Sequence, residues 1–192
     1  DPGLPLASSC TEGIVNNTQP NSRHTNDGIT FIPGVNRFFS FAGSLSCASS
    51  ARSNATWTYN FSGTGSGTYW QQMNPAGSIP VPTEHASVAY DPNSGDVFIA
   101  TDVDLYRYNF VTNSITRLTN GSAWPPIPLG TTGIIDPNTQ RFIVIGSGAS
   151  YWYDISPGST WNRNNLASSG ATGAYGPGLA YDPVQQRVVA WT

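Results

Sequence analysis

An all-β fold made of short antiparallel strands is the class that this sequence predicts, and three observations predict it. The 192 residues contain no window with the sustained apolar period of 3.6 residues that an amphipathic helix would show. β-Branched and aromatic residues are frequent, and clusters of Gly, Pro and Asn interrupt them at short intervals. A strand–turn–strand pattern also recurs along the chain. With 38% hydrophobic and 12% aromatic residues, the chain can bury a core although only 10% of its residues are charged.

The recurring pattern is clearest at residues 134–145, where an apolar strand, a turn at Asp136-Pro137 and a second apolar strand follow one another. Copies lie at residues 88–100 and 179–191, and a less regular copy lies at residues 29–41. The prolines of the four copies are 59, 45 and 46 residues apart in chain order. The fourth residue after each proline is charged and opens the second strand; these residues are Arg37, Asp96, Arg141 and Arg187. A period of this length, with several strands in each unit, indicates a propeller or an array.

Residues 1–23 show no clear period and are predicted to form an extended lead-in. Three complete units and one partial unit follow, at about residues 24–74, 84–120, 130–164 and 176–192. In each complete unit the third strand ends in an aromatic and an Asx residue: Tyr59-Asn60, Tyr108-Asn109 and Tyr153-Asp154. A short turn, for which Asx and Gly residues are suited, then leads to a fourth strand that carries Trp70, Leu118 or Trp161.

The predicted architecture is a β-propeller of four-stranded antiparallel blades, of which about three and a half are present, so that the ring is incomplete. Propellers usually have about 4 to 8 blades. An open arc exposes an apolar blade face and unpaired strand edges. We therefore expect the rest of the propeller, supplied by the same polypeptide or by another chain, to complete the ring.

The chain resembles the kelch family of β-propellers, whose blades carry a small or Gly pair after the second strand, then a Tyr, then a Trp. The third unit fits best, with these residues: Gly146, Gly148, Tyr151 or Tyr153, and Trp161. The first unit keeps Gly43, Trp57, Tyr59 and Trp70, whereas the second unit departs with Ala100-Thr101 and Leu118. The resemblance covers residues 24–192 and implies a propeller. Some kelch-type propellers are copper-radical oxidases that need a Cys–Tyr pair and two His ligands.

Cys10 and Cys47 are the two cysteines of the chain. A disulfide between them would raise the free energy of unfolding by roughly 3 to 4 kcal/mol by the chain-entropy estimate. It would also tether the lead-in, which is otherwise not attached to the rest of the fold. The alternative is two buried free thiols in a cytosolic protein. We favour the disulfide and therefore a secreted, extracellular protein, in which Cys47 is not free for a Cys–Tyr pair. Four sequons, at Asn16, Asn54, Asn60 and Asn120, would permit N-glycosylation there.

Charge and hydropathy limit the classes of partner. The net charge of −3, the pI of about 5.1 and the absence of a basic run oppose a nucleic-acid-binding surface. No stretch of about 18 apolar residues occurs, so no membrane span is predicted.

Candidate binding residues lie in or beside the long loops that join successive strand pairs, at residues 43–54, 74–83, 120–130 and 164–177. Strand alternation places these loops on one face, and long loops on a rigid scaffold often carry binding sites. Trp124 and Tyr175 could stack on a sugar or anchor a protein partner, or could simply pack against the blade tops. Arg52 lies in the first of these loops and His85 follows the second; His85 could instead hold a structural position before its strand.

No motif of a zinc protease, thiol redox protein, serine hydrolase or P-loop enzyme occurs, so we predict no catalytic residue, cofactor or metal ligand in this chain. The expected function is a module that binds proteins or glycans, or makes structural interactions, through the long-loop face. One alternative is part of a secreted kelch-type enzyme, a copper-radical oxidase or a glycan-active enzyme, whose catalytic residues lie outside this chain. Another is a subunit of an extracellular filament or coat.

Overall fold

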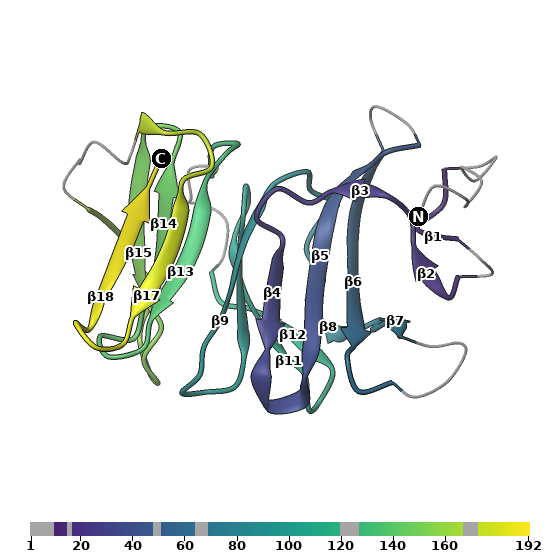
Figure 1. Ribbon diagram of the computed structural model, residues 1–192, viewed down its shortest axis with the longest axis horizontal. Helices are drawn as coiled ribbons and strands as arrows, with labels where there is room; N and C mark the ends of the chain where they lie inside the picture. Colours follow the sequence, from purple (N-terminus) through teal and green to yellow (C-terminus); the bar gives the residue numbers. More distant parts are fainter. Residues whose placement is uncertain (1–9, 15–16, 48–50, 64–68, 120–126, 167–172) are drawn as a thin grey trace.

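The protein is all-β, and its strands form several antiparallel sheets (Figure 1). The computed structural model describes residues 10–14, 17–47, 51–63, 69–119, 127–166 and 173–192. Within these ranges, residues 33–35 form a 3-10 turn, η1 (Pro33–Val35). None of the helices in the described part of the chain is long and apolar enough to cross a membrane.

Three sheets contain four consecutive strands, each hydrogen-bonded to the next in antiparallel register. Sheet 1 consists of β4 (Ile29–Ile32), β5 (Arg37–Leu45), β6 (Arg52–Asn60) and β7 (Trp70–Gln72). Sheet 2 consists of β9 (Ala86–Tyr90), β10 (Val97–Thr101), β11 (Leu105–Asn109) and β12 (Ser114–Arg117). Sheet 3 consists of β13 (Thr132–Asp136), β14 (Arg141–Gly146), β15 (Ala149–Asp154) and β16 (Arg163–Asn165). Sheet 4 is the pair β17 (Gly178–Asp182) and β18 (Arg187–Trp191).

Short strands extend these sheets at their margins. β3 (Arg23–His24) pairs with β5, and β8 (Ala76–Gly77) pairs in parallel with β12, which joins the chain after sheet 1 to sheet 2. β1 (Gly13–Ile14) and β2 (Gln19–Pro20) form a separate two-stranded sheet within the lead-in. The lead-in therefore has defined structure in its described part, where the sequence predicted an extended segment.

The Asp-Pro turns that carry the sequence repeat are closed by their aspartate side chains. Asp91, Asp136 and Asp182 each accept a hydrogen bond from the backbone amide two residues later, over 3.1, 3.0 and 2.9 Å. This Asx turn accounts for an aspartate at each of these positions, because its side chain replaces a backbone acceptor in the turn. The first unit has no such aspartate, and there η1 makes the turn, with Asn36 in the left-handed region.

Sheet 2 packs on sheet 1 through a row of side chains that crosses its four strands. Cross-strand register places these residues side by side: Tyr90, Val97, Tyr108 and Ile115. They share one hydrophobic cluster with Ile32, Phe39 and Phe41 of sheet 1, and the rings of Phe39 and Tyr108 lie 5.2 Å apart. We call this side of a sheet its row face.

Sheet 3 packs on sheet 2 in the same way. Its row contains Ile135, Phe142 and Tyr153, which are cross-strand neighbours and are buried. They share a cluster with Ala89, Phe98 and Leu105, which come from the other side of sheet 2. We call this second side the cover face. Sheets 2 and 3 thus turn their row faces to the preceding sheet, and sheet 2 turns its cover face to the following one.

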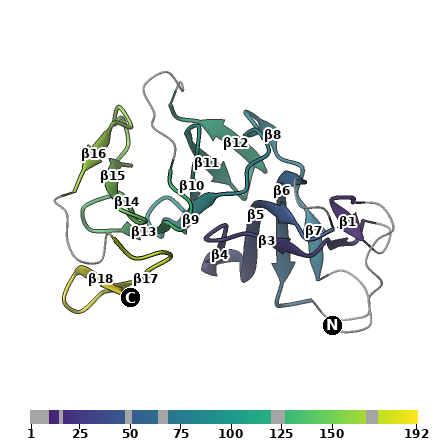
Figure 2. The ribbon, with the colours of Figure 1, turned by 90° about the horizontal axis from the view of Figure 1, so that it is seen from above.

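The first strands of the four sheets contact one another in chain order, β4 with β9, β9 with β13 and β13 with β17. Seen from above, the sheets form an arc around these strands, with sheets 1 and 4 at its two ends (Figure 2). The continuous hydrophobicity of second strands such as β14 follows from this arrangement, because both faces of an inner sheet are covered.

Candidate binding site at the cavity between the first strands

A cavity of about 420 Å³ lies between the first strands of the four sheets. Its wall is mainly apolar, with contributions from residues such as Ile29, Val88, Ile134 and Leu179. Polar groups are few and include Asp27, Thr30 and Thr132. A concave, largely apolar wall with a small number of polar groups is typical of ligand sites in proteins.

Asp27, directly before β4, connects three sheets at this cavity. Its side-chain Oδ2 accepts a hydrogen bond of 2.6 Å from the Gly133 amide of sheet 3, which is 106 residues away in the sequence. Its backbone carbonyl accepts a hydrogen bond of 3.2 Å from the Val88 amide of sheet 2. Burial raises the pKa of Asp27 to about 8, and the Gly133 and Val88 amides oppose this rise. The carboxyl group is therefore largely neutral at pH 7 and can both donate and accept hydrogen bonds.

A polar cluster lies next to Asp27, at the junction of sheets 1 and 2. The Asn26 amide group donates a hydrogen bond of 2.9 Å to the Glu84 carbonyl and lies 3.4 Å from Nδ1 of His85. Arg52 forms an ion pair with Glu84 over 3.4 Å, and both side chains are partly exposed. We call Asn26, Arg52, Glu84 and His85 the mouth cluster. Its side chains are held by protein contacts and still present charged and hydrogen-bonding groups to solvent.

The structure brings together two of the predicted binding residues, Arg52 and His85. Tyr175 lies apart from them, at the junction of sheets 3 and 4, where its ring packs over Gly130. The Gly130 backbone has a φ of +81°, and a Cβ atom there would come within 2.4 Å of the Tyr175 ring. Tyr175 is nevertheless 65% exposed. Trp124 lies outside the described residues.

No protein-family model matches the chain, and none of the curated proteins matches it.

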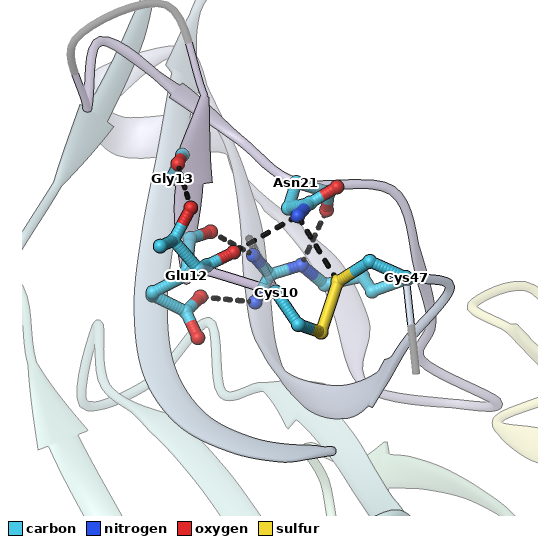
Figure 3. Close-up of a disulfide and its surroundings, with 7 residues drawn as sticks. Cys10, Glu12, Gly13, Asn21 and Cys47 are labelled. Atoms are coloured by element: carbon cyan, nitrogen blue, oxygen red, sulfur yellow. Dashed lines mark hydrogen bonds and ion pairs between the residues drawn. A yellow bond between two sulfur atoms is a disulfide. The ribbon is translucent and has the colours of Figure 1, made fainter. Parts of the chain in front are cut away.

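The predicted disulfide between Cys10 and Cys47 is confirmed, with Cα atoms 5.2 Å apart (Figure 3). Beside it, Arg23 forms an ion pair of 2.5 Å with Glu12, and Glu12 accepts a hydrogen bond of 2.9 Å from the Trp57 indole. The Asn21 side chain donates to the Thr11 carbonyl and to Sγ of Cys47. The lead-in is thus fixed to sheet 1 by the disulfide and by a partly buried polar network. Cys47 is not free for a Cys–Tyr pair.

Two of the four predicted glycosylation sites are described, and they differ in their contacts. The Asn54 amide group donates a hydrogen bond of 2.9 Å to the Pro80 carbonyl. Oδ1 of Asn60 accepts a hydrogen bond of 3.0 Å from the Ser62 amide, which forms an Asx turn. Asn16 and Asn120 lie outside the described residues.

Sequence reasoning missed Asp27, Asn26 and the cavity. The signal for Asp27 is its place in the repeat, six residues before the proline of its unit. At the same place the other units have an uncharged residue: Ala86, Thr131 and Pro177. An acidic residue that interrupts an otherwise uncharged repeat position is a candidate for a special role. Within the part of the chain that the structure describes, no group of three or more His, Cys, Asp or Glu side chains could hold a metal ion.

Proposed function

We propose that the chain forms part of a kelch-type β-propeller and works as an extracellular binding module, with a protein or glycan ligand bound at its long-loop face. The observation that carries this proposal is the ordered contact of four first strands around one cavity, with successive sheets stacked row face on cover face. Blades of a propeller stack around a central channel in this way.

The mouth cluster supports a ligand with polar groups. It contains a guanidinium group, a carboxylate, an imidazole and an amide, which come from three separate parts of the sequence. The ion pair between Arg52 and Glu84 is half-exposed, so that a ligand can compete for its hydrogen-bonding groups at little cost. Asp27 adds a group at the adjoining cavity that can donate or accept a hydrogen bond.

The disulfide supports secretion, because such bonds persist in oxidising compartments. An extracellular propeller with a polar mouth can recognise glycans or proteins without chemistry of its own. The mouth cluster also contains Arg52, which a protein partner could contact. Arg is frequent among the residues that contribute most to the binding energy of protein interfaces.

Glycan-array binding of the fluorescently labelled chain tests this proposal. We expect saturable binding to a subset of glycans, and about tenfold weaker binding for Arg52→Ala and for His85→Ala, equivalent to about 1.4 kcal/mol. Arg187→Ala is the matched control, because Arg187 lies on β18, is 66% exposed at its side chain and is not part of the mouth cluster. Equal binding by all four proteins would contradict a site at the mouth cluster. Loss of binding in Arg187→Ala alone would indicate that the glycan binds at sheet 4.

A further inference from the structure

Sheet 1 carries its own row of side chains, at the positions that are buried in sheets 2 and 3. Cross-strand register places these residues side by side on β4, β5, β6 and β7: Phe31, Phe38, Tyr59 and Trp70. Phe31 and Phe38 stand at the same distances from Pro33 as Tyr90 and Val97 stand from Pro92. We call these four side chains the aromatic row.

The aromatic row is uncovered, in contrast to its equivalents. Tyr108 and Tyr153, the third members of the rows of sheets 2 and 3, are fully buried. In sheet 1 Tyr59 is partly exposed and Phe31 is 44% exposed. Phe61 and Tyr69, whose rings lie 5.2 and 5.4 Å from that of Tyr59, extend the exposed surface. Phe31, Phe61 and Tyr69 are exposed, and the other three aromatic side chains are partly exposed. A surface cluster of this kind is unusual for a monomer and indicates a contact surface.

The lead-in covers only another part of this side of sheet 1. Trp57 lies on the same side as Tyr59, two residues away on β6, and is fully buried where its indole meets Glu12. In Figure 1 the lead-in strands β1 and β2 lie beyond β6 and β7, at the outer end of the arc. In the described part of the chain, no sheet covers the first two strands of sheet 1, which carry Phe31 and Phe38.

Sheet 4, at the opposite end of the arc, has an uncovered cover face. Ala180 and Val189 are cross-strand neighbours and occupy the positions of Ala89 and Phe98, which cover the row of sheet 3. Trp191 extends this surface and packs over Gly178. Val189 is 39% exposed and Trp191 is 55% exposed.

We propose that a second copy of this chain occupies the aromatic row, with the cover face of sheet 4 in one copy packed on sheet 1 of the other. The occupant follows from the chain itself. Sheet 2 packs on sheet 1, sheet 3 packs on sheet 2 and sheet 4 contacts sheet 3, which leaves the row of sheet 1 and the cover face of sheet 4 unmatched. The aromatic row contains no charged side chain. On the cover face of sheet 4, Arg187 and Asp182 lie beside Val189 and Ala180 and form an ion pair with each other over 4.0 Å, so that neither charge is left without a partner when the face is buried.

The contact is heterologous, since two different surfaces meet. Two copies make it twice and bring eight sheets together, which lies at the upper end of the range of about 4 to 8 sheets in closed propellers. A dimer of this kind goes beyond the binding role proposed above. It does not depend on whether a ligand binds at the mouth cluster.

The test is the solution mass of the full chain and of two blocked variants, measured by light scattering after size-exclusion chromatography. The chain should have twice its monomer mass of 20.5 kDa. Phe31→Glu blocks the aromatic row and Val189→Glu blocks the cover face, and each variant alone should be monomeric because every contact needs both surfaces. Mixed in equal amounts, the two variants should form a dimer through their remaining intact surfaces.

The mixture also shows that both variants are folded, since an unfolded partner could not restore association. Val111→Glu is the matched control, because Val111 is 87% exposed in the turn between β11 and β12, and this variant should remain a dimer. A monomeric wild-type chain would overturn the proposal. So would a Val189→Glu variant that still dimerises, which would indicate contact between two aromatic rows, or a mixture of blocked variants that stays monomeric.

Discussion

Asp27 forms hydrogen bonds to two sheets other than the one it precedes. Its carboxyl group joins the segment before β4 to the backbone of β13, and its carbonyl joins the same segment to β9. An Asp side chain in this place is held mainly in its neutral form, because burial raises its pKa to about 8. The folded state therefore binds a proton between about pH 4 and 8 that the unfolded chain has released.

This linkage gives the first prediction, for the Asp27→Asn variant. Because the pKa of Asp27 is higher in the folded state than its ordinary value of 3.8, its contribution to stability is present at low pH and is lost as the pH rises toward 8. The free energy of unfolding of the wild-type chain should fall by up to about 1.4 kcal/mol per pH unit from this group. An Asn side chain can still accept the Gly133 hydrogen bond but does not titrate, so the fall should be smaller in the variant.

Urea unfolding at several pH values between 5 and 8 measures this difference. Asp102→Asn is the control, because Asp102 lies in the turn after β10 and is not part of the cavity wall. It should keep the pH dependence of the wild-type chain. Parallel curves for wild type and Asp27→Asn would show that Asp27 is ionised in the folded protein over this range.

Among the elements, the lead-in depends most on a single covalent bond. The disulfide closes a loop with a sequence separation of 37 and fixes a segment that has only two short strands of its own. Replacement of both Cys10 and Cys47 by Ser should lower the free energy of unfolding by about 3 to 4 kcal/mol. Chemical unfolding of the variant and of the wild-type chain, with and without reductant, checks this. A reductant should affect only the wild-type chain, and equal stability of the two proteins would show that the polar network holds the lead-in without the disulfide.

Two of the Asp-Pro hairpins also bind the next sheet through an Asn side chain. The Asn93 amide group donates a hydrogen bond of 2.7 Å to the Pro137 carbonyl, and that of Asn138 donates one of 2.7 Å to the Tyr181 hydroxyl. Both bonds are exposed, so Asn93→Ala or Asn138→Ala should cost about 0.5 to 1 kcal/mol of unfolding free energy. Val184 occupies the same position in the fourth hairpin and is 83% exposed. Val184→Ala should leave the unfolding free energy unchanged. If it lowers the unfolding free energy as much as the Asn variants do, the loss comes from the changed turn and not from the missing hydrogen bond between sheets.

The sequence predicts these hairpins well, because each strand–turn–strand unit is local and is repeated with its proline and aspartate. It predicts the fourth strands less well. β12 ends one residue before Leu118, and β16 begins two residues after Trp161, whose backbone is left-handed with a φ of 55°. Trp161 still packs near Phe98, so the repeat marks a packing position and not a strand position.

The candidate site could be predicted only in part, for a physical reason. The sequence predicted Arg52 in a loop and His85 before a first strand. The structure brings the two together, but Arg52 is the first residue of β6 and not a loop residue. The place of Asp27 in the repeat marks it as unusual, but its partner could not be predicted, because its side chain accepts a hydrogen bond from a residue 106 positions away. The cavity itself depends on how four strands from different units come together.

At the scale of the whole molecule, one packing rule accounts for the order of the sheets. Sheets 2 and 3 each bury a row of side chains on the sheet before them, which places sheets 1 and 3 on opposite sides of sheet 2. The rule also explains why the two ends of the arc expose apolar surface. Burial of apolar surface contributes about 25 cal/mol per Å², so two matched faces of this kind provide a strong drive to associate.

Oxidative footprinting by mass spectrometry tests this rule most directly, because three tyrosines stand at the same register position in three sheets. The Val189→Glu variant is suitable, since its aromatic row should stay uncovered. We predict that Tyr59 of sheet 1 is oxidised much faster than Tyr108 of sheet 2 and Tyr153 of sheet 3. Similar oxidation of all three tyrosines, or faster oxidation of Tyr108, would contradict the stacking of each sheet on the one before it.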